Sequence, residues 1–339
     1  MNMSDKSEAE KEISKIIGFD VATVKKEWKD KIKLGNEFRD DELQHISSGS
    51  IKLDWALKRP FLEGQLVEIF APNATGKTTL ALHVCKNAMK MGKLVFYVDL
   101  ERKLREAQIE MIPGFERERF TIIYPDTGEE AMNMMHELIT DYPGCLVILD
   151  SVGGILPEVE DAEDYEKQSR ALVARLCAKL IRKITGITAR NKCVVVFLNH
   201  LTATMAMYGQ AETTHGGRAI RNRCAQRIEL KNLASGAIKR GEDKIGQMVK
   251  ATVVKNNVNR PFITVEFPII YGSGIDEELD ILQFAKDLGI LPYKNGWYMV
   301  QRPEMEEPKR MREKDVLELL KDDLVFRQEI LESVRTIFE

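Results

Sequence analysis

The chain has 339 residues, 44% hydrophobic and 30% charged, so it is long enough to bury the core of one large domain and a smaller one. Its 53 acidic and 50 basic side chains give a formal net charge of -3, which excludes a uniformly basic DNA-coating protein and an acidic disordered chain. The longest apolar runs have the length of strands, and the polar start MNMSDKSEAEKE is unlike a secretory signal. Because no apolar run is long enough to cross a bilayer, no membrane span is expected. Five scattered cysteines without a CxxC pair favour a reduced, cytoplasmic protein without structural zinc.

Residues 1–45 form the first predicted unit, a charged segment of helical character. Its apolar side chains recur at the spacing of one helix face: Ile13, Ile16, Ile17, Val21, Val24 and Trp28. Because such a face must be buried, we expect it to pack on its own domain or on a neighbouring subunit.

Residues 46–274 form the predicted core, in which short apolar strands alternate with helices. Nearly continuous apolar runs predict strands at 66–70, 94–98, 120–124, 145–149 and 193–198, with helices at 80–91, 129–139 and 171–189. This alternation predicts an α/β fold with a mostly parallel central sheet covered by helices on both faces. Further strands are expected at 228–230, 250–254 and 264–267, with a turn over residues 234–246 between the first two.

Residues 275–339 are predicted to form a small C-terminal domain. Apolar residues spaced for amphipathic helices occur between 279 and 288 and again between 316 and 334. Pro303 and Pro308 mark a loop between these helices.

The strongest local motif lies between the first predicted strand and the helix that follows it. It runs through Ala71, Pro72, Asn73, Ala74, Thr75, Gly76, Lys77, Thr78 and Thr79. Apart from Ala71, where the strict pattern has glycine, this is a P-loop, whose backbone N–H groups surround phosphate oxygens at a helix N-terminus. Lys77 is expected to reach the β- and γ-phosphates and the Thr78 hydroxyl to bind Mg²⁺. The motif therefore predicts a nucleoside triphosphatase.

Carboxylates end two of the predicted strands. Asp150 ends the strand at 145–149, at the sheet edge where open parallel sheets bind ligands, and we expect it to hold the water shell of Mg²⁺. Asp99 and Glu101 follow the strand at 94–98, and their spacing places them on one face. A carboxylate beside the γ-phosphate can orient and deprotonate the attacking water.

Together these motifs resemble the RecA family of ATP-dependent homologous recombinases, over roughly residues 46–298. Besides the P-loop, the resemblance includes Asp99-Leu100-Glu101, Leu149-Asp150-Ser151-Val152, Glu212-Thr213-Thr214-His215-Gly216-Gly217 and Val254-Lys255-Asn256. It implies a RecA-like P-loop NTPase core at 46–274, an N-terminal helical oligomerisation segment at 1–45 that docks on the next protomer, and a small C-terminal α/β domain at 275–339. Shortened ends and two substitutions, at His200 and Asn257, favour a phage or plasmid (UvsX-type) homologue.

The resemblance assigns roles to single residues and implies ATP and Mg²⁺ as cofactors. Glu101 matches the catalytic glutamate that activates water, and Lys255 matches a lysine that reaches the ATP of the neighbouring protomer. With Lys77 these are the expected catalytic residues. His200 stands where bacterial members have a glutamine that senses the γ-phosphate, although an ordinary loop histidine is the alternative.

The chain departs from the family pattern at several contacts. Asn257 replaces a second lysine that acts across the interface, so either Lys255 suffices or Arg260 substitutes. Arg105 and Gln108 replace the residues that contact adenine.

A basic stretch from Leu201 to Phe262 is the predicted DNA-binding region. It holds eleven Lys or Arg against four acidic residues, a surplus of seven positive charges. Basic side chains along the backbone, with a few that insert between bases, are what single-strand binding requires. The loop at 158–169 is rich in acidic residues, so its charge does not suit it to bind DNA phosphates. The expected DNA-binding residues are Arg170, Arg175, Met205, Met207, Tyr208, Thr213, Thr214, Gly216, Gly217, Arg218, Arg221 and Arg227.

The resulting hypothesis is a DNA-dependent ATPase that forms filaments on single-stranded DNA and catalyses homologous pairing and strand exchange in recombination and repair. Its expected partners are single-stranded DNA, homologous duplex DNA and further copies of the chain, with single-strand-binding and loader proteins as candidates. One alternative is a RecA-like hexameric helicase or motor, and another is a non-catalytic accessory DNA-binding protein. Intact Lys77, Glu101 and Asp150 favour an enzyme over the accessory protein.

Overall fold

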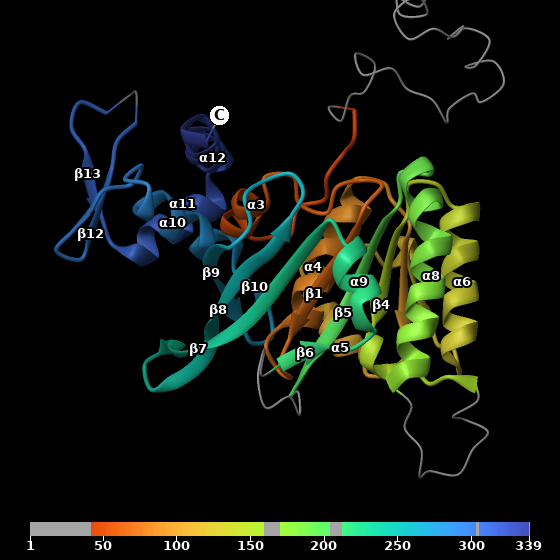
Figure 1. The fold of residues 1–339 in the computed structure, drawn as a ribbon. Helices are drawn as coiled ribbons and strands as arrows, with labels where there is room; N and C mark the ends of the chain where they lie inside the picture. The colour runs from red at the N-terminus through yellow and green to blue at the C-terminus, as the bar shows by residue number, and fades with distance from the viewer. Residues whose placement is uncertain (1–41, 159–169, 204–211, 303–304, 339) are drawn as a thin grey trace, which may run out of the picture. The chain divides into compact units, whose positions relative to one another are not determined.

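The computed structural model describes residues 42–158, 170–203, 212–302 and 305–338 (Figure 1). The chain divides into two compact units, residues 1–44 and residues 45–339, and every element below belongs to the second. The predicted N-terminal helical segment lies outside the described residues apart from its last few positions. Its oligomerisation role stays a prediction.

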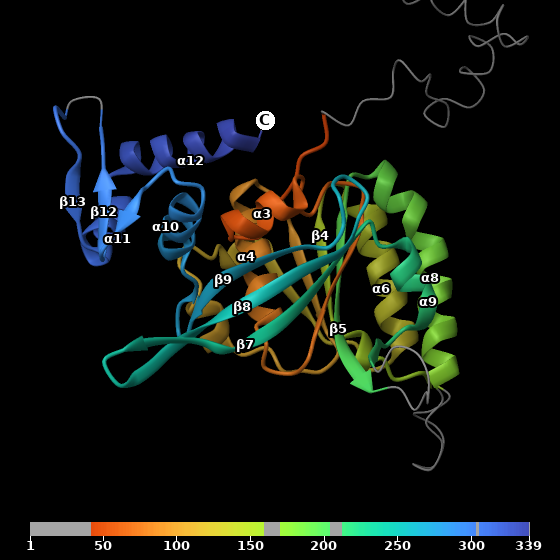
Figure 2. The ribbon, with the colours of Figure 1, turned by 60° about the vertical axis from the view of Figure 1, so that its left-hand side comes forward.

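In the described part of the chain, ten strands form one large sheet in the order β10-β9-β8-β7-β1-β5-β4-β2-β3, with β6 paired to β5. The six strands from β7 to β3 pair in parallel, whereas β7 to β10 pair antiparallel (Figures 1 and 2). The predicted α/β fold with a mostly parallel central sheet is confirmed. The strands are β1 (Leu66–Ala71), β2 (Val95–Asp99), β3 (Phe120–Ile123), β4 (Leu146–Asp150), β5 (Val194–Ala203), β6 (Glu212–Thr214), β7 (Gln226–Arg240), β8 (Asp243–Asn256), β9 (Ile263–Ile270) and β10 (Gly274–Ile275).

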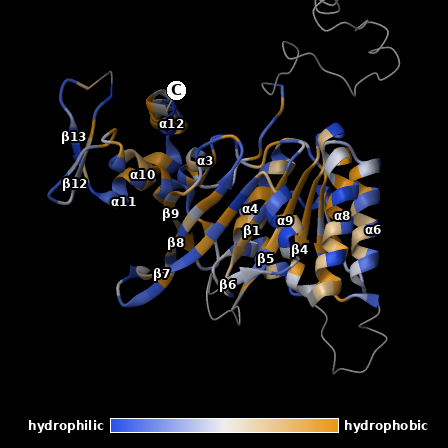
Figure 3. Cartoon of the chain, viewed as in Figure 1, coloured by the Kyte–Doolittle hydropathy of each residue, from blue (hydrophilic) through white to orange (hydrophobic). Residues whose placement is uncertain are grey.

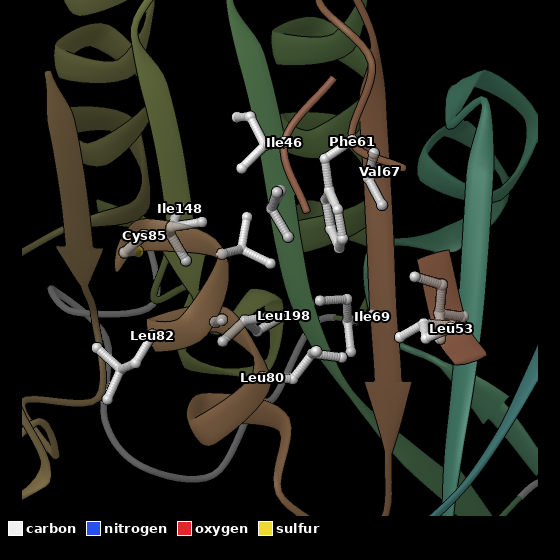
Figure 4. Close-up of a cluster of buried hydrophobic side chains, with 14 of the residues drawn as sticks. Ile46, Leu53, Phe61, Val67, Ile69, Leu80, Leu82, Cys85, Ile148 and Leu198 are labelled. Atoms are coloured by element: carbon white, nitrogen blue, oxygen red, sulfur yellow. The ribbon is translucent and has the colours of Figure 1, made fainter. Parts of the chain in front are cut away.

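Successive side chains of a strand point to opposite faces of the sheet. Because the parallel strands are apolar at successive positions, both faces are apolar, and helices cover each of them. Val67, Ile69 and Tyr97 enter one core with the apolar residues of α4, and Figure 4 shows part of this cluster. Leu66 and Phe96 enter the other core, with residues of α6 and α8. The helices around the sheet are α3 (Ile51–Leu57), α4 (Lys77–Lys90), α5 (Glu106–Glu110), α6 (Gly128–Asp141), α8 (Arg170–Arg190) and α9 (Gly217–Arg223).

The turn predicted over residues 234–246 is wrong. Strands β7 and β8 pair from Gln226 and Asn256 as far as Arg240 and Asp243, so the turn is reduced to two residues. The pairing register shifts between Asn232 and Ala237, so the residues between them form a bulge in β7. Small residues at this bulge interrupt the apolar pattern by which a strand is recognised in the sequence. The far end of this hairpin is hydrophilic (Figure 3).

Residues 277–338 build a further core beyond the sheet. A three-stranded sheet, β11 (Tyr293–Lys294), β12 (Trp297–Val300) and β13 (Lys309–Met311), packs with α10 (Glu277–Asp287), α11 (Glu313–Asp322) and α12 (Leu324–Phe338). Since residues 45–339 form one compact unit, the domain boundary expected after residue 274 stays a prediction. No helix in the described part of the chain is long and apolar enough to span a bilayer.

Candidate active site

The P-loop sequence forms the connection from β1 to α4 at the carboxyl end of the parallel strands. Gly76 precedes α4 with φ 92°, and a Cβ there would lie 2.5 Å from Ile269 Cδ1, so the position requires glycine. The Thr75 hydroxyl donates to the Pro72 carbonyl at 2.9 Å, which holds the loop in shape. No side chain of the described residues caps the first turn of α4, and its N–H groups are therefore suited to bind phosphate.

Lys77 is buried inside its own loop. Its Nζ donates to the carbonyls of Ala71 and Pro72 at 3.1 and 2.9 Å and lies 3.3 Å from His200 Nδ1. Burial lowers the pKa of Lys77. An anionic phosphate would reverse that effect, because it stabilises the charged form of the lysine.

Asp150 and Asp99 end neighbouring strands but have different surroundings. The Asp150 Oδ2 accepts a hydrogen bond from the Tyr97 hydroxyl at 2.5 Å, and burial raises the pKa of Asp150. Asp99 is fully buried and accepts the backbone N–H of Lys103 and Leu104 at 3.3 and 3.0 Å. Asp99 therefore holds the turn after β2.

Glu101 lies between the P-loop side and the end of β4. Its Oε1 accepts from the Ser151 hydroxyl and lies 3.2 Å from His200 Nε2, while its Oε2 accepts from Lys103 Nζ. The hydrogen bond from His200 is the main cause that holds the pKa of Glu101 below its usual range. Glu101 is thus a carboxylate at neutral pH, as a base requires.

His200 links the two expected catalytic groups, because one ring nitrogen faces Lys77 and the other faces Glu101. A cavity of about 720 Å³ opens here, with Asn73, Glu101 and His200 among its lining residues. That volume lies within the range of ligand pockets in proteins, about 300–1,000 Å³. The fold therefore brings together Lys77, Glu101, Asp150 and His200, which are far apart in sequence.

The donor set at this site fits Mg²⁺. Thr78 in the first turn of α4 offers a hydroxyl, and Asp150 offers a carboxylate, which are the hard oxygen ligands that Mg²⁺ prefers. Within the described residues no group of three or more His, Cys, Asp or Glu side chains could hold a metal alone.

Asn199 connects the site to the predicted DNA-binding loop. Its side chain donates to the His215 carbonyl at 3.0 Å and accepts the His215 N–H at 3.1 Å. The same amide donates to the fully buried Glu68 at 2.9 Å, and Glu68 accepts from Arg227 Nε at 2.5 Å. The guanidinium of Arg227 is thus committed to an internal carboxylate, and this argues against its predicted DNA contact.

The other predicted DNA-binding residues lie around β6 and the helices beside it. Thr213 and Thr214 belong to β6, and Gly216 and Gly217, with φ 79° and 71°, lead into α9. Arg218 and Arg175 are exposed, and Arg221 is half-buried. Arg170 is the first residue of α8. Met205, Met207 and Tyr208 lie outside the described residues, as does nearly all of the acidic loop.

Lys255, near the end of β8, lies at the C-terminal end of α9. Its Nζ donates to the Asn222 carbonyl at 2.7 Å, and burial lowers the pKa of Lys255. Its reach to a neighbour's ATP stays a prediction. Gln108 accepts the Arg105 N–H at 2.9 Å at the start of α5.

Sequence reasoning missed Tyr97, Lys103, Asn199 and Glu68 as parts of this site. Tyr97 and Glu68 lie inside strands, where only their polar atoms distinguish them from core residues. A polar residue in an otherwise apolar strand was the available signal for both.

Comparison with known families decides the membership of the chain. The family described as the RecA N-terminal domain matches residues 15–276. The chain belongs to the RecA family. Its RecA relatives include the protein of Citrifermentans bemidjiense, 36% identical over 269 residues that cover 79% of each chain. The RecA protein of Gloeobacter violaceus is 34% identical over 305 residues, which cover 90% of this chain and 80% of that one.

A solved structure supports the RecA-like fold. The crystal structure of the RadB recombinase matches with a TM-score of 0.51 and 21% identity, over 68% of this chain and 98% of that chain. At this identity the likeness concerns the fold of the RecA-like core.

Proposed function

We propose that this RecA-family chain is a DNA-dependent ATPase that forms a filament of identical copies on single-stranded DNA and exchanges strands with a homologous duplex. One observation carries the proposal: Lys77, His200 and Glu101 form a continuous set of contacts beside the P-loop. Asn199, the residue before His200, holds the segment that leads to the predicted DNA loop.

In the proposed hydrolysis, the N–H groups of residues 72–78 and the Lys77 ammonium bind the phosphates of ATP. Glu101 orients a water molecule toward the γ-phosphate and takes its proton. Thr78, and Asp150 through water, would hold Mg²⁺, which would neutralise charge on the phosphates. Lys255 of a neighbouring copy stabilises the charge that develops on the γ-phosphate.

The same contacts provide a route from ATP to DNA. When Lys77 turns from the carbonyls of its loop to a phosphate, His200 loses that neighbour and can contact the γ-phosphate itself. Because Asn199 binds both backbone groups of His215, a shift at the end of β5 would be transmitted to residues 212–217. Arg175, Arg218 and Arg221 are the described residues that we propose to contact the DNA backbone, together with the loop at 204–211.

The proposal also names a setting for this activity. A recombinase of this kind would act in the cytoplasm, with homologous duplex DNA as its second substrate. Single-strand-binding and loader proteins are the further partners that such a filament would meet.

A strand-exchange assay tests the proposal. A labelled single strand and a homologous duplex are mixed with the protein and ATP, with ADP in place of ATP, or with the Lys77→Ala variant. We expect exchange with ATP only, and ATP turnover that rises when single-stranded DNA is added. Turnover that is the same with and without single-stranded DNA would contradict the proposal, and rings in electron micrographs would favour a helicase.

A further inference from the structure

Tyr97 lies behind the candidate site, in the middle of the large sheet. Its side chain is fully buried, and its ring packs against Phe120 with centroids 5.9 Å apart. Strands β2 and β4 pair in parallel, with Tyr97 beside Ile148 and two positions before the pair of Asp99 and Asp150. In this register the Tyr97 side chain is long enough for its hydroxyl to reach the Asp150 carboxylate, and the hydroxyl donates a hydrogen bond to Oδ2 at 2.5 Å.

Packing alone does not account for this hydroxyl. A phenylalanine would fill nearly the same volume without a polar atom, and burying a hydroxyl is unfavourable unless it finds a partner. Here the partner is a carboxylate, and hydrogen bonds to charged acceptors are shorter and stronger than those between neutral groups. The hydroxyl therefore acts mainly on the orientation of Asp150.

We propose that Tyr97 is a positioning residue for the Mg²⁺ that accompanies the nucleotide. With Oδ2 held by the tyrosine, the carboxylate cannot rotate freely. The structure records no partner for Oδ1 among the described residues, so this oxygen is left for the water shell of the metal. Groups that orient a metal-binding side chain in this way commonly change metal affinity when they are removed. The inference rests on the proposed ATPase function.

The Tyr97→Phe variant tests this role by a binding measurement. ATP binding is followed by isothermal titration calorimetry at increasing Mg²⁺, and again with EDTA in place of the metal. We expect the Mg²⁺ concentration at half-saturation to rise about 3- to 10-fold, below the effect typical of groups that orient direct ligands. Binding in EDTA should be unchanged. The matched control is Tyr298→Phe, which removes the hydroxyl of a tyrosine in the core around α10–α12 and should leave half-saturation as in the wild type.

A second pair of variants separates positioning from folding. In the Asp150→Ala background the Tyr97→Phe change should have no further effect on Mg²⁺ half-saturation, since its target is gone. A purely structural tyrosine would lower the unfolding temperature equally in both backgrounds and leave half-saturation unchanged. If wild type and Tyr97→Phe reach half-saturation at the same Mg²⁺ concentration, the positioning role of Tyr97 is wrong, whereas the proposed ATPase function is unaffected. Wild-type binding of ATP that does not depend on Mg²⁺ would instead overturn the nucleotide site on which it rests.

Discussion

At the scale of single residues, the candidate site is defined by side chains that hold one another. Glu101 contacts Ser151, His200 and Lys103, and its neutral-pH charge follows from these contacts. Lys77 and His200 add the phosphate-facing side. Each role can be tested by a substitution that changes one function and keeps the shape.

Glu101→Gln should separate nucleotide binding from hydrolysis. The amide still accepts a hydrogen bond from Ser151, but it cannot take a proton from water. We expect ATP turnover to fall about 10²- to 10⁴-fold, as for the loss of a general base. ATP affinity should stay within about twofold, because a general base acts mainly in the transition state. The control is Arg102→Ala, which removes the exposed pair with Asp126 and the contact of the guanidinium with the Tyr124 ring. Turnover near the wild-type rate in Glu101→Gln would exclude Glu101 as the base.

Arg227→Met should destabilise the fold, since it removes the cationic partner of Glu68 and leaves this buried side chain with the hydrogen bond from Asn199. Glu68 is fully buried and the Arg227 side chain is 15% exposed. Removing one partner of a buried ion pair typically costs about 3–5 kcal/mol of folding free energy. Chemical denaturation measures this loss, with Lys231→Met on the exposed side of β7 as the control. If both variants lose the same small amount, the pair has no structural role, and Arg227 becomes available again as a DNA contact.

At the scale of elements, α3 and α10 are joined by a polar contact inside the protein. The Ser50 hydroxyl caps α3 by accepting the Leu53 N–H at 3.2 Å and donates to Asp280 Oδ2 at 2.7 Å. Asp280 belongs to α10 and is fully buried. Burial is the main cause that raises the pKa of Asp280 to about 7. This junction should therefore respond to pH.

Asp280→Asn should make stability less dependent on pH. The folded state keeps the Asp280 proton up to about pH 7, whereas the unfolded chain loses it near pH 4, so this group lowers stability as pH rises from about 4 to 7. The asparagine keeps an acceptor for Ser50 and does not titrate. We expect the fall in unfolding temperature between pH 5 and pH 8 to be smaller by a few degrees than in the wild type. The exposed Asp322→Asn on α11 is the control, and identical pH profiles for all three proteins would contradict the assignment.

At the scale of the whole molecule, the proposed ATPase needs two copies of the chain. Glu101 and Lys77 lie on the P-loop side, while Lys255 lies at the end of α9 and is expected to serve the neighbouring copy. The basic surplus between residues 201 and 262 lies in a chain of net charge -3, so we expect DNA binding to be confined to this region. Affinity for DNA should therefore fall steeply with salt.

Mixing two inactive variants tests this assembly. The Glu101→Gln copy keeps Lys255, and the Lys255→Ala copy keeps Glu101. When the Lys255 of the first variant faces the ATP site of the second, that interface contains both intact groups. Random mixing of equal amounts should restore about one quarter of the wild-type turnover per chain on single-stranded DNA, as expected for a head-to-tail interface. Turnover no greater than the sum of the separate variants would show that each site is complete within one copy.

Local patterns along the chain were enough to predict the α/β class, the P-loop and the carboxylate at the end of β4, because each of these features lies within a short stretch of sequence. A P-loop needs only a strand, a loop with Gly76 and Lys77 and a helix, all within about thirty residues. Apolar strands that are buried on both faces are likewise visible from a few consecutive residues. The family resemblance then supplied Glu101, which local pattern alone did not distinguish from a surface glutamate.

The pairs of polar atoms that contact one another became visible in the folded chain. Tyr97 and Asp150 are 53 positions apart, and Glu68 and Arg227 are 159 apart, so no periodicity joins them. The same reason explains why the sequence did not show that Arg227 is held by Glu68: only the folded sheet brings the two side chains together. Backbone pairing across the sheet likewise extended β7 through small residues that predict a turn. Local pattern fixes the elements, whereas their long-range hydrogen bonds and charges fix the chemistry of the site.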